Sequence, residues 1–106
     1  MVLLHIICKD RQLSDDIADL LVKENLVLEA VTFQNVSVRV REKNGTVGRS
    51  EQTMLIGRTR GLLFNTVQEL LRERYPTNMP VIYSMPIVNM NWQDADALPV
   101  VNSELD

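Results

Sequence analysis

A long stretch without proline or glycine limits the possible folds of this chain more than any other feature. It covers residues 26–41 and ends in alternating valines and polar residues, which is typical of a β-strand with two different faces. Asn44-Gly45 then gives a strong hairpin-turn signal, and a return strand is predicted from about residue 48 to residue 59. Sixteen strand residues would span roughly 50 Å, whereas a domain of this size has a radius of gyration of about 13 Å. We therefore expect the hairpin, with a bulge near Gln34-Asn35, to project from its domain and pack on another subunit, because long strand edges invite pairing.

The segments on either side of the hairpin predict the rest of a two-layer fold. Residues 2–8 are apolar and rich in branched side chains, as expected of a buried central strand. A helix of about three turns is predicted next from the spacing of its leucines and isoleucine, with Ser14 as its N-cap and Asn25 near its end. A second amphipathic helix is predicted to begin near Leu63 and to be closed by Pro76.

The stretch from Tyr75 to Val88 is predicted to return a last strand to the middle of the sheet. Its apolar residues fall on both strand faces, and Pro76 and Pro80 favour extended backbone at its start. The order of elements is therefore β-α-β-β-α-β, the pattern of an α+β, ferredoxin-like sandwich. Right-handed crossovers then place both helices on one face of a four-stranded antiparallel sheet.

The composition is that of an ordinary globular domain. The 106 residues are 45% hydrophobic and 24% charged, so we expect a single domain, with a core at about 2–98 and a C-terminal tail at 99–106. The lone Cys8 cannot form an internal disulfide, and no segment resembles a signal peptide or a membrane helix. These features predict a cytoplasmic protein without membrane insertion. The net charge of −3 argues against general binding of nucleic acid.

The proline-spaced segment Tyr75-Pro76-Thr-Asn-Met-Pro80-Val-Ile-Tyr-Ser-Met-Pro86-Ile87 resembles the H-P-Y-x-x-P-E-I-x-x-L-P-I/V run of the CutA family of divalent-cation tolerance proteins. Asp10 after the first strand, MLIGRT at 54–59 and Asn91-Trp92 are similar to the family as well. The resemblance covers about residues 3–98. It implies a ferredoxin-like subunit related to the PII regulatory proteins, and a homotrimer whose long hairpins pair with neighbouring subunits.

The chain departs from the family pattern where ligand-side residues would stand. Tyr75, Thr77 and Val81 replace the family's usual His, Tyr and Glu. Residues 28–31, Leu-Glu-Ala-Val, stand in place of its A-C-V-N segment, so the typical cysteine is absent. The resemblance therefore carries over the framework of the subunit rather than a ligand set.

The candidate metal ligands are His5, Cys8 and Glu29, for copper or another divalent cation. His5 and Cys8 are three residues apart on a strand and point to opposite faces, so they cannot hold one ion together. A site shared between subunits could add Asp94, Asp96 or the thioethers of Met79, Met85 and Met90. The alternative for each is structural, since a lone histidine, a lone cysteine and methionines also serve as sheet and core residues, and carboxylates as solvated surface.

The predicted hairpin is basic, whereas the rest of the chain is acidic. Residues 39–60 hold six Arg or Lys against two Glu, a balance of +4, which leaves −7 for all other residues. We expect Arg58 and Arg60, next to Gly61 at the start of the second predicted helix, to bind an anion in a cleft between subunits, because helix N-termini and arginine side chains both suit anions. Arg39 and Arg41 are further candidate ligands. The alternative is that the basic hairpin meets the acidic surface of a neighbouring subunit. Aromatic residues for base stacking are missing nearby, which argues against nucleic acid.

Two functions of the binding class follow from these observations. One is a non-enzymatic homotrimer concerned with divalent-ion tolerance or response. The other is a PII-like regulatory module, in which an anionic ligand or nucleotide alters the hairpin that a protein partner contacts. An assembly module without a ligand is a third possibility. An enzyme is not expected, because the chain has one histidine, no nucleophile next to a base and no glycine-rich phosphate loop.

Overall fold

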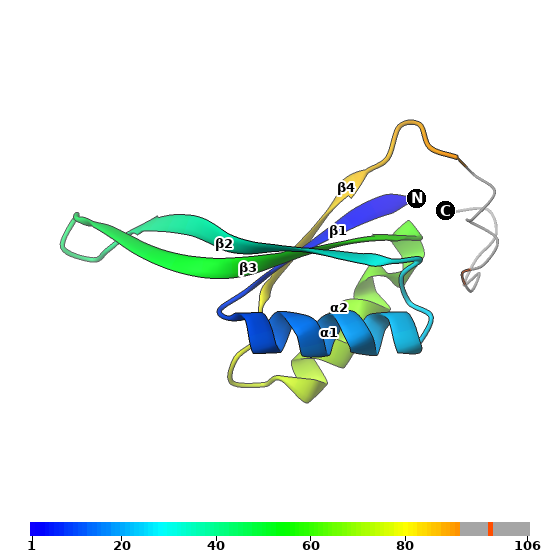
Figure 1. The fold of residues 1–106 in the computed structure, drawn as a ribbon, viewed down its shortest axis with the longest axis horizontal. Helices are drawn as coiled ribbons and strands as arrows, with labels where there is room; N and C mark the ends of the chain where they lie inside the picture. Colours follow the sequence, from blue (N-terminus) through cyan, green and yellow to red (C-terminus); the bar gives the residue numbers. More distant parts are fainter. Residues whose placement is uncertain (92–97, 99–106) are drawn as a thin grey trace.

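The chain folds as a four-stranded antiparallel sheet with two helices on one face (Figure 1). The computed structural model describes residues 1–91 and 98. The elements follow in the order β1 (Val2–Cys8), α1 (Arg11–Lys23), β2 (Ala30–Arg41), β3 (Val47–Thr59), η1 (Gly61–Leu63, a 3-10 helix), α2 (Phe64–Arg74) and β4 (Val81–Pro86). The strands lie in the order β2-β3-β1-β4, and every pair is antiparallel. The predicted ferredoxin-like α+β fold is confirmed.

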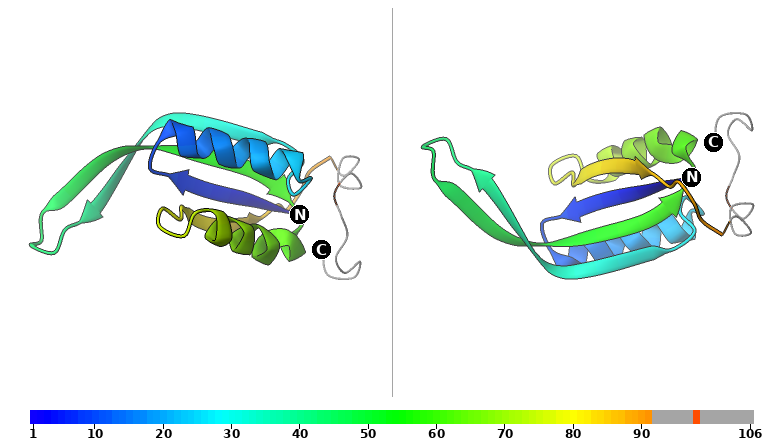
Figure 2. Two further views of the ribbon diagram at one scale, coloured as in Figure 1. Left: turned by 90° about the horizontal axis from the view of Figure 1, so that it is seen from below. Right: turned by 90° about the horizontal axis from the view of Figure 1, so that it is seen from above.

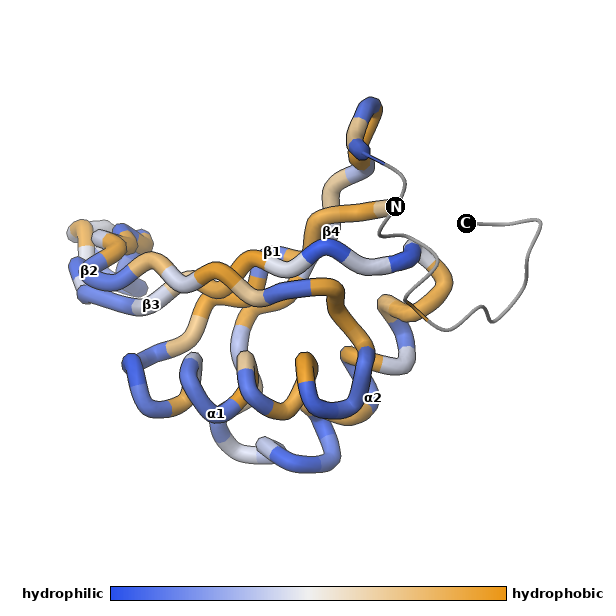
Figure 3. Tube along the Cα trace, turned by 45° about the vertical axis from the view of Figure 1, so that its right-hand side comes forward, coloured by the Kyte–Doolittle hydropathy of each residue, from blue (hydrophilic) through white to orange (hydrophobic). Residues whose placement is uncertain are grey.

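The core lies between the sheet and the two helices. Strand β1 contributes Leu4 and Ile6, which are almost fully buried, and the helices cover them with residues spaced by four, Ile17 and Leu21 on α1 and Val67 and Leu71 on α2. Figure 3 shows hydrophobic and hydrophilic stretches alternating along the strands, and the outer turns of both helices as mostly hydrophilic. Each such side chain contributes about 1.5–3 kcal/mol through burial. Within the described residues, no helix has the length and apolar composition needed to cross a membrane.

Helix α1 begins about one turn earlier than the sequence predicted. Asp10 is its N-cap, and the carboxylate accepts a hydrogen bond from the backbone N–H of Leu13 at 2.9 Å. Ser14, the predicted cap, lies inside the helix on its buried face, so that prediction was wrong. Both residues precede apolar positions at a suitable spacing and are equally good capping residues, but the chain turns into the helix directly after β1, at Asp10. Asn25, with a φ of 57°, turns the chain just after the helix as predicted.

The β2–β3 hairpin projects well beyond the body of the molecule, as predicted (Figures 1 and 2). The molecule measures 48 × 28 × 22 Å along its principal axes. We call residues 36–52, the outer part of this hairpin, the arm. Strand β2 starts at Ala30 rather than near residue 26, so its 12 residues are fewer than predicted. At the tip only Gly45 adopts a positive φ, of 88°, while Asn44 accepts hydrogen bonds from Thr46 through its side chain.

The predicted bulge at Gln34-Asn35 is confirmed. Phe33 pairs with Met54 and Val36 pairs with Gln52, so that two residues of β2 lie opposite one residue of β3. Asn35 adopts a positive φ of 58°, which asparagine tolerates better than most residues. The bulge marks the point where the hairpin leaves the body.

The last strand is an edge strand and does not return to the middle of the sheet. Among the residues that the structure describes, β4 pairs with β1 alone, and β1 takes a central place between β3 and β4. Val81, Tyr83 and Met85 are exposed. The apolar residues on both faces of this segment suggested a central strand, but only one of its faces packs on the helices. The other belongs to a bare apolar surface.

The sheet face turned away from the helices is also apolar and has no covering among the described residues. We call it the open face. Strand alternation gives its members as Leu3, His5 and Ile7 of β1, Val31 and Phe33 of β2, Met54 and Ile56 of β3, and Val81, Tyr83 and Met85 of β4, together with the charged Arg58 at one end of β3. Beyond the bulge the register places Val36, Val38 and Val40 of the arm on the same side. Phe33 is 45% exposed and Val81 59%. Large apolar surfaces of this kind mark contacts with other chains.

Candidate functional site

Two of the predicted ligand residues, Glu29 and Arg58, bind each other. The Arg58 Nε atom lies 2.8 and 2.9 Å from the two carboxylate oxygens of Glu29, and Nη2 donates to Oε1 as well. The side chain of Arg58 is 27% exposed and that of Glu29 42%. The hydrogen bonds from Arg58 hold the pKa of the Glu29 carboxyl below its ordinary value. The pair neutralises both charges, so neither residue presents an isolated charge to an external ligand, although each keeps further hydrogen-bonding capacity.

Arg60 lies just past the end of β3, where the chain enters η1. Its backbone carbonyl accepts a hydrogen bond from the N–H of Leu63 at 3.0 Å. Helix α2 begins at Phe64, and Gly61 opens a 3-10 helix of three residues instead of the helix that the sequence predicted there. Because such a short 3-10 helix has a weak dipole, the helix N-terminus adds little to anion binding by Arg60.

The other predicted anion ligands, Arg39 and Arg41, lie on the arm. The register pairs Arg39 with Arg49 and Arg41 with Val47, whereas Arg58 stands at the far end of β3. The structure of the single chain thus divides the four predicted arginines into two groups, one on the arm and one at the opposite end of the sheet.

His5 and Cys8 point to opposite faces of β1, as predicted. His5 belongs to the open face and stacks on Tyr83, with ring centroids 5.1 Å apart and an interplanar angle of 8°. Its Nδ1 atom is buried and has no hydrogen-bond partner among the described residues. Cys8 is fully buried on the helix side, and burial, with the charge of Asp10, raises the pKa of its thiol to about 11. A protonated, buried thiol is a poor ligand for a metal ion at neutral pH.

The donor atoms of one subunit do not converge on a metal ion. The described part of the chain holds no group of three or more His, Cys, Asp or Glu side chains that could bind one. Met79 packs against the main core, Met85 lies on the open face, and Met90 packs against a separate small cluster. Asp94 and Asp96 lie outside the described residues. One subunit alone therefore does not fit a divalent cation through its described residues.

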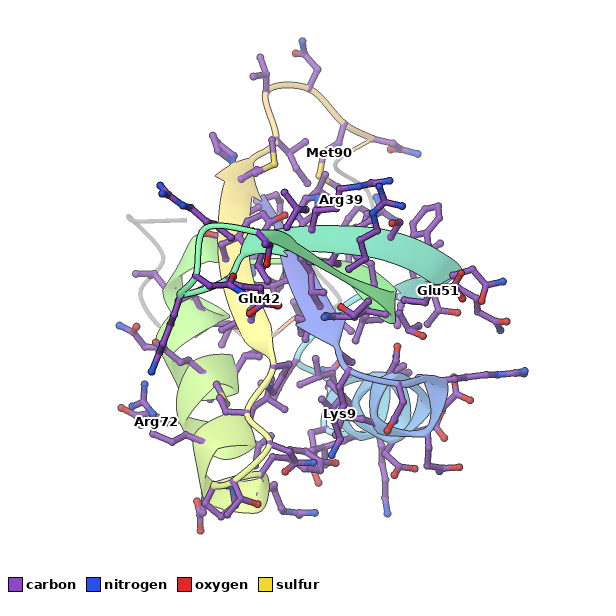
Figure 4. The ribbon with its side chains drawn as sticks, turned by 90° about the vertical axis from the view of Figure 1, so that its left-hand side faces the viewer. Lys9, Arg39, Glu42, Glu51, Arg72 and Met90 are labelled. Carbon is purple, nitrogen blue, oxygen red and sulfur yellow. The ribbon has the colours of Figure 1, made fainter. Side chains whose placement is uncertain are left out.

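Two polar clefts adjoin the loop between β1 and α1. The larger, of about 260 Å³, lies at the base of the arm and is lined by Lys9, Asp10 and Arg11, by the bulge, and by Glu51. The smaller, of about 220 Å³, shares Lys9 and Asp10 and reaches Tyr75. Figure 4, which looks along the arm toward the body, shows Lys9 and Glu51 at this end of the molecule. Both positive and negative side chains line the larger cleft, so it suits a polar ligand that carries both donors and acceptors.

Sequence reasoning missed the larger cleft as a site. Asp10 directly after β1 and the bulge at Asn35 were each visible in the sequence, but they lie 25 positions apart. Pairing of β2 with β3 and of β3 with β1 brings them to the same end of the sheet. Only the register reveals that the two features share one cleft.

Comparison with known proteins places this fold in a family. A family model described as CutA1 divalent ion tolerance protein matches residues 2–95. Three solved structures of similar fold are the divalent cation tolerance protein (Cut A1) from Thermus thermophilus, CutA from the phytopathogenic bacterium Xylella fastidiosa, and the periplasmic divalent cation tolerance protein CutA from Archaeoglobus fulgidus.

These structures agree with the chain over nearly its whole length despite low sequence identity. The Thermus protein is 23% identical, with a TM-score of 0.80 and coverage of 92% of this chain and 95% of that chain. The Xylella protein is 18% identical (TM-score 0.78, 99% and 97% covered), and the Archaeoglobus protein is 18% identical (TM-score 0.79, 92% and 95% covered). No curated protein sequence matches the chain. The proline-spaced segment, the fold and the family match agree, and the chain belongs to the CutA1 divalent ion tolerance protein family.

Proposed function

We propose that the protein acts in divalent-ion tolerance as a non-enzymatic homotrimer that binds its ligand between subunits. The observation that carries this proposal is the open face, which leaves a continuous apolar surface on the sheet and on one side of the arm. In a monomer this apolar surface would be exposed to water, which is unfavourable and promotes aggregation. Packing against other copies of the chain would bury it. The long arm supports the same proposal, because it reaches far enough to contact a neighbouring subunit.

A cation site between subunits follows from the placement of the donors. Within one subunit His5 and Cys8 lie on opposite faces, and Glu29 is held by Arg58. Copper or another divalent cation would therefore need ligands from at least two copies. His5 is the best placed of the three candidates, because it belongs to the face that assembly would bury.

The experiment combines a mass measurement with a thermal-shift panel. Light scattering should give three times the 12.1 kDa chain mass, and copper or zinc should raise the melting temperature in proportion to the logarithm of their concentration. Phe33→Asp on the open face should abolish both the assembly and the shift. Val22→Asp, at a position of similar exposure on α1, is the matched control and should change neither. A monomeric wild-type protein, or a copper shift that survives in monomeric Phe33→Asp, would refute the proposal.

A second candidate function is the PII-like one, in which an anionic small molecule or nucleotide binds beside the arm and a protein partner responds. The cleft at the base of the arm favours it, because Lys9 and Arg11 stand there next to the bulge from which the arm departs. At about 260 Å³ the cleft is small for a nucleotide, so a second subunit would have to complete it. Adenine nucleotides in the same panel test this function. A shift that is lost in Lys9→Ala or Arg11→Ala, which remove cations from the cleft, but kept in the helix variant Arg72→Ala would support it.

A cytoplasmic location belongs to the same proposal. The Archaeoglobus relative is described as periplasmic, so location within the family is a question for each member. Fractionation of cells that express the tagged protein tests it directly.

A further inference from the structure

The smaller of the two polar clefts is formed by segments that lie far apart in the sequence. One is the start of α1 with the turn before it, and the other is the loop from α2 to β4, which returns to the same end of the body (Figure 1). The cleft has a volume of about 220 Å³ and is lined by Lys9, Asp10, Gln12, Leu13, Asp16, Tyr75 and Asn78. All of them lie outside the strands, so assembly through the open face and the strand edges would not use their side chains.

Two carboxylates face this cleft at different levels of α1. Asp10 accepts a hydrogen bond from the backbone N–H of Leu13 at 2.9 Å, and Asp16 accepts one from Nε2 of Gln12 at 3.0 Å. A carboxylate has about four acceptor positions, so each keeps capacity for a ligand. Neither forms an ion pair within the described part of the chain. Their positions are about 9 Å apart along the helix axis, so they can bind two separate cationic groups of one ligand.

The other polar groups of the cleft complement these carboxylates. Lys9 forms no ion pair among the described residues, and Figure 4 shows it beside the first turn of α1. Burial, and then the charge of Asp16, raises the pKa of the Tyr75 phenol, so this group stays protonated and can both donate and accept a hydrogen bond. Asn78 adds an amide with the same capacity. The lining thus carries one ammonium against two carboxylates, a balance of −1.

We propose that this cleft binds a basic α-amino acid of about the size of lysine, with its carboxylate at Lys9 and its two ammonium groups at Asp10 and Asp16. Such a ligand carries the reverse of the charges in the lining, two ammonium groups and one carboxylate. Pockets for drug-sized molecules measure about 300–1,000 Å³, so a cleft of 220 Å³ suits a smaller ligand of this kind. The negative balance disfavours a simple anion. The proposal goes beyond assembly and ion tolerance, and its cleft is separate from the larger one at the base of the arm.

The test is isothermal titration calorimetry of the assembled protein with lysine and three analogues that each lack one charged group. Cadaverine lacks the carboxylate, Nα-acetyl-lysine lacks the α-ammonium group, and norleucine lacks the side-chain ammonium group. We expect lysine to bind most tightly and each analogue to bind about tenfold more weakly, because each loses one charged hydrogen-bonding contact. The affinity for lysine should fall as salt rises.

Variants of the lining test the placement of the ligand. Asp16→Asn should weaken lysine binding by about tenfold, and Asp10→Asn should do the same while it keeps the helix N-cap, since asparagine caps as well as aspartate. Tyr75→Phe, which removes only the hydroxyl, should cause a smaller loss. Asp19→Asn makes the same charge change at an exposed position of α1 outside the cleft and should keep wild-type affinity. Unchanged melting temperatures would confirm that the variants fold.

Four results would overturn the proposal. The first is the lack of saturable binding of lysine up to about 10 mM. The second is equal affinity for lysine and any of the three analogues, because the corresponding charged group would then make no contact. The third is an equal loss in Asp19→Asn and Asp16→Asn, which would mean that only net charge matters. The fourth is loss of lysine binding in Arg11→Ala with no loss in Asp16→Asn, because Arg11 lines only the larger cleft.

Discussion

Replacing Glu29 with Gln tests how much the charged hydrogen bonds between Glu29 and Arg58 stabilise the fold. The Glu29–Arg58 pair joins the segment before β2 to the end of β3, next to a backbone hydrogen bond from Leu28 N–H to the Arg58 carbonyl at 2.9 Å. Hydrogen bonds to charged groups contribute about 1.5–3 kcal/mol when well shielded, and exposed ion pairs about 0.2–1 kcal/mol. At 27% and 42% exposure the pair lies between these cases. We expect Glu29→Gln to lower the free energy of unfolding by about 1 kcal/mol at neutral pH.

The pH dependence of this loss follows from the pKa of Glu29. Arg58 lowers that pKa from 4.5 in the folded state, so the unfolded chain binds a proton at a higher pH than the folded one. The stabilisation is therefore fully present above pH 4.5 and is lost as the pH falls through the folded pKa. The difference between wild type and Glu29→Gln should stay constant from pH 8 to about pH 5.5 and shrink below pH 4.5.

Urea denaturation across this pH range, at one fixed protein concentration, measures the difference. A fixed concentration matters because assembly makes apparent stability concentration-dependent. Glu69→Gln, at an exposed position on α2, is the matched control and should be nearly neutral at every pH. A difference for Glu29→Gln that is below about 0.3 kcal/mol, or that does not change with pH, would refute the assignment of a stabilising pair.

Three further predictions test the caps, the turn and the thiol. Asp10→Ala should cost about 1 kcal/mol of unfolding free energy through loss of the N-cap, whereas Ser14→Ala should cost less than half as much; equal losses would contradict the cap assignment. Gly45→Ala should cost about 1 kcal/mol because of its φ of 88°, while a Cβ at Gly48 meets only the movable end of a glutamate side chain, so thermal melting should rank Gly45→Ala as the less stable variant. Cys8, with a thiol pKa raised to about 11, should react with iodoacetamide at pH 8 only after denaturation, and rapid labelling of the native protein would refute its burial.

Local signals in the sequence were sufficient to predict most of the fold. Asn44-Gly45 located the turn, and the alternating valines before it located the arm, because turn chemistry and strand alternation act over a few neighbouring residues. The bulge was found for the same reason. The N-cap was assigned wrongly because Asp10 and Ser14 offer equivalent local signals. Only the distance between the end of β1 and the first helical turn separates them.

Features that depend on contacts between distant segments were predicted less well. Apolar residues on both faces of β4 could not distinguish a central strand from an edge strand beside a bare apolar face. Arg58 was expected to meet an external anion, but Glu29, 29 positions earlier in the sequence, already occupies it in the structure. No local pattern records such a pair. The division of the predicted arginines between the arm and the opposite end of the sheet is likewise a property of register.

The bulge at Gln34-Asn35 also determines where the chain tolerates a change in length. Within the arm itself, an insertion or deletion of one residue would exchange the two faces of every position beyond it, so that valines would take the places of arginines. Deletion of Asn35 alone would instead convert the bulge into regular pairing, with Gln34 opposite Thr53 and Val36 still opposite Gln52. A change of one residue in the length of β2 can thus be absorbed at the bulge without a change of register in the arm. Sequence changes that alter the arm by single residues should be tolerated there, and everywhere else the arm should lengthen or shorten in steps of two.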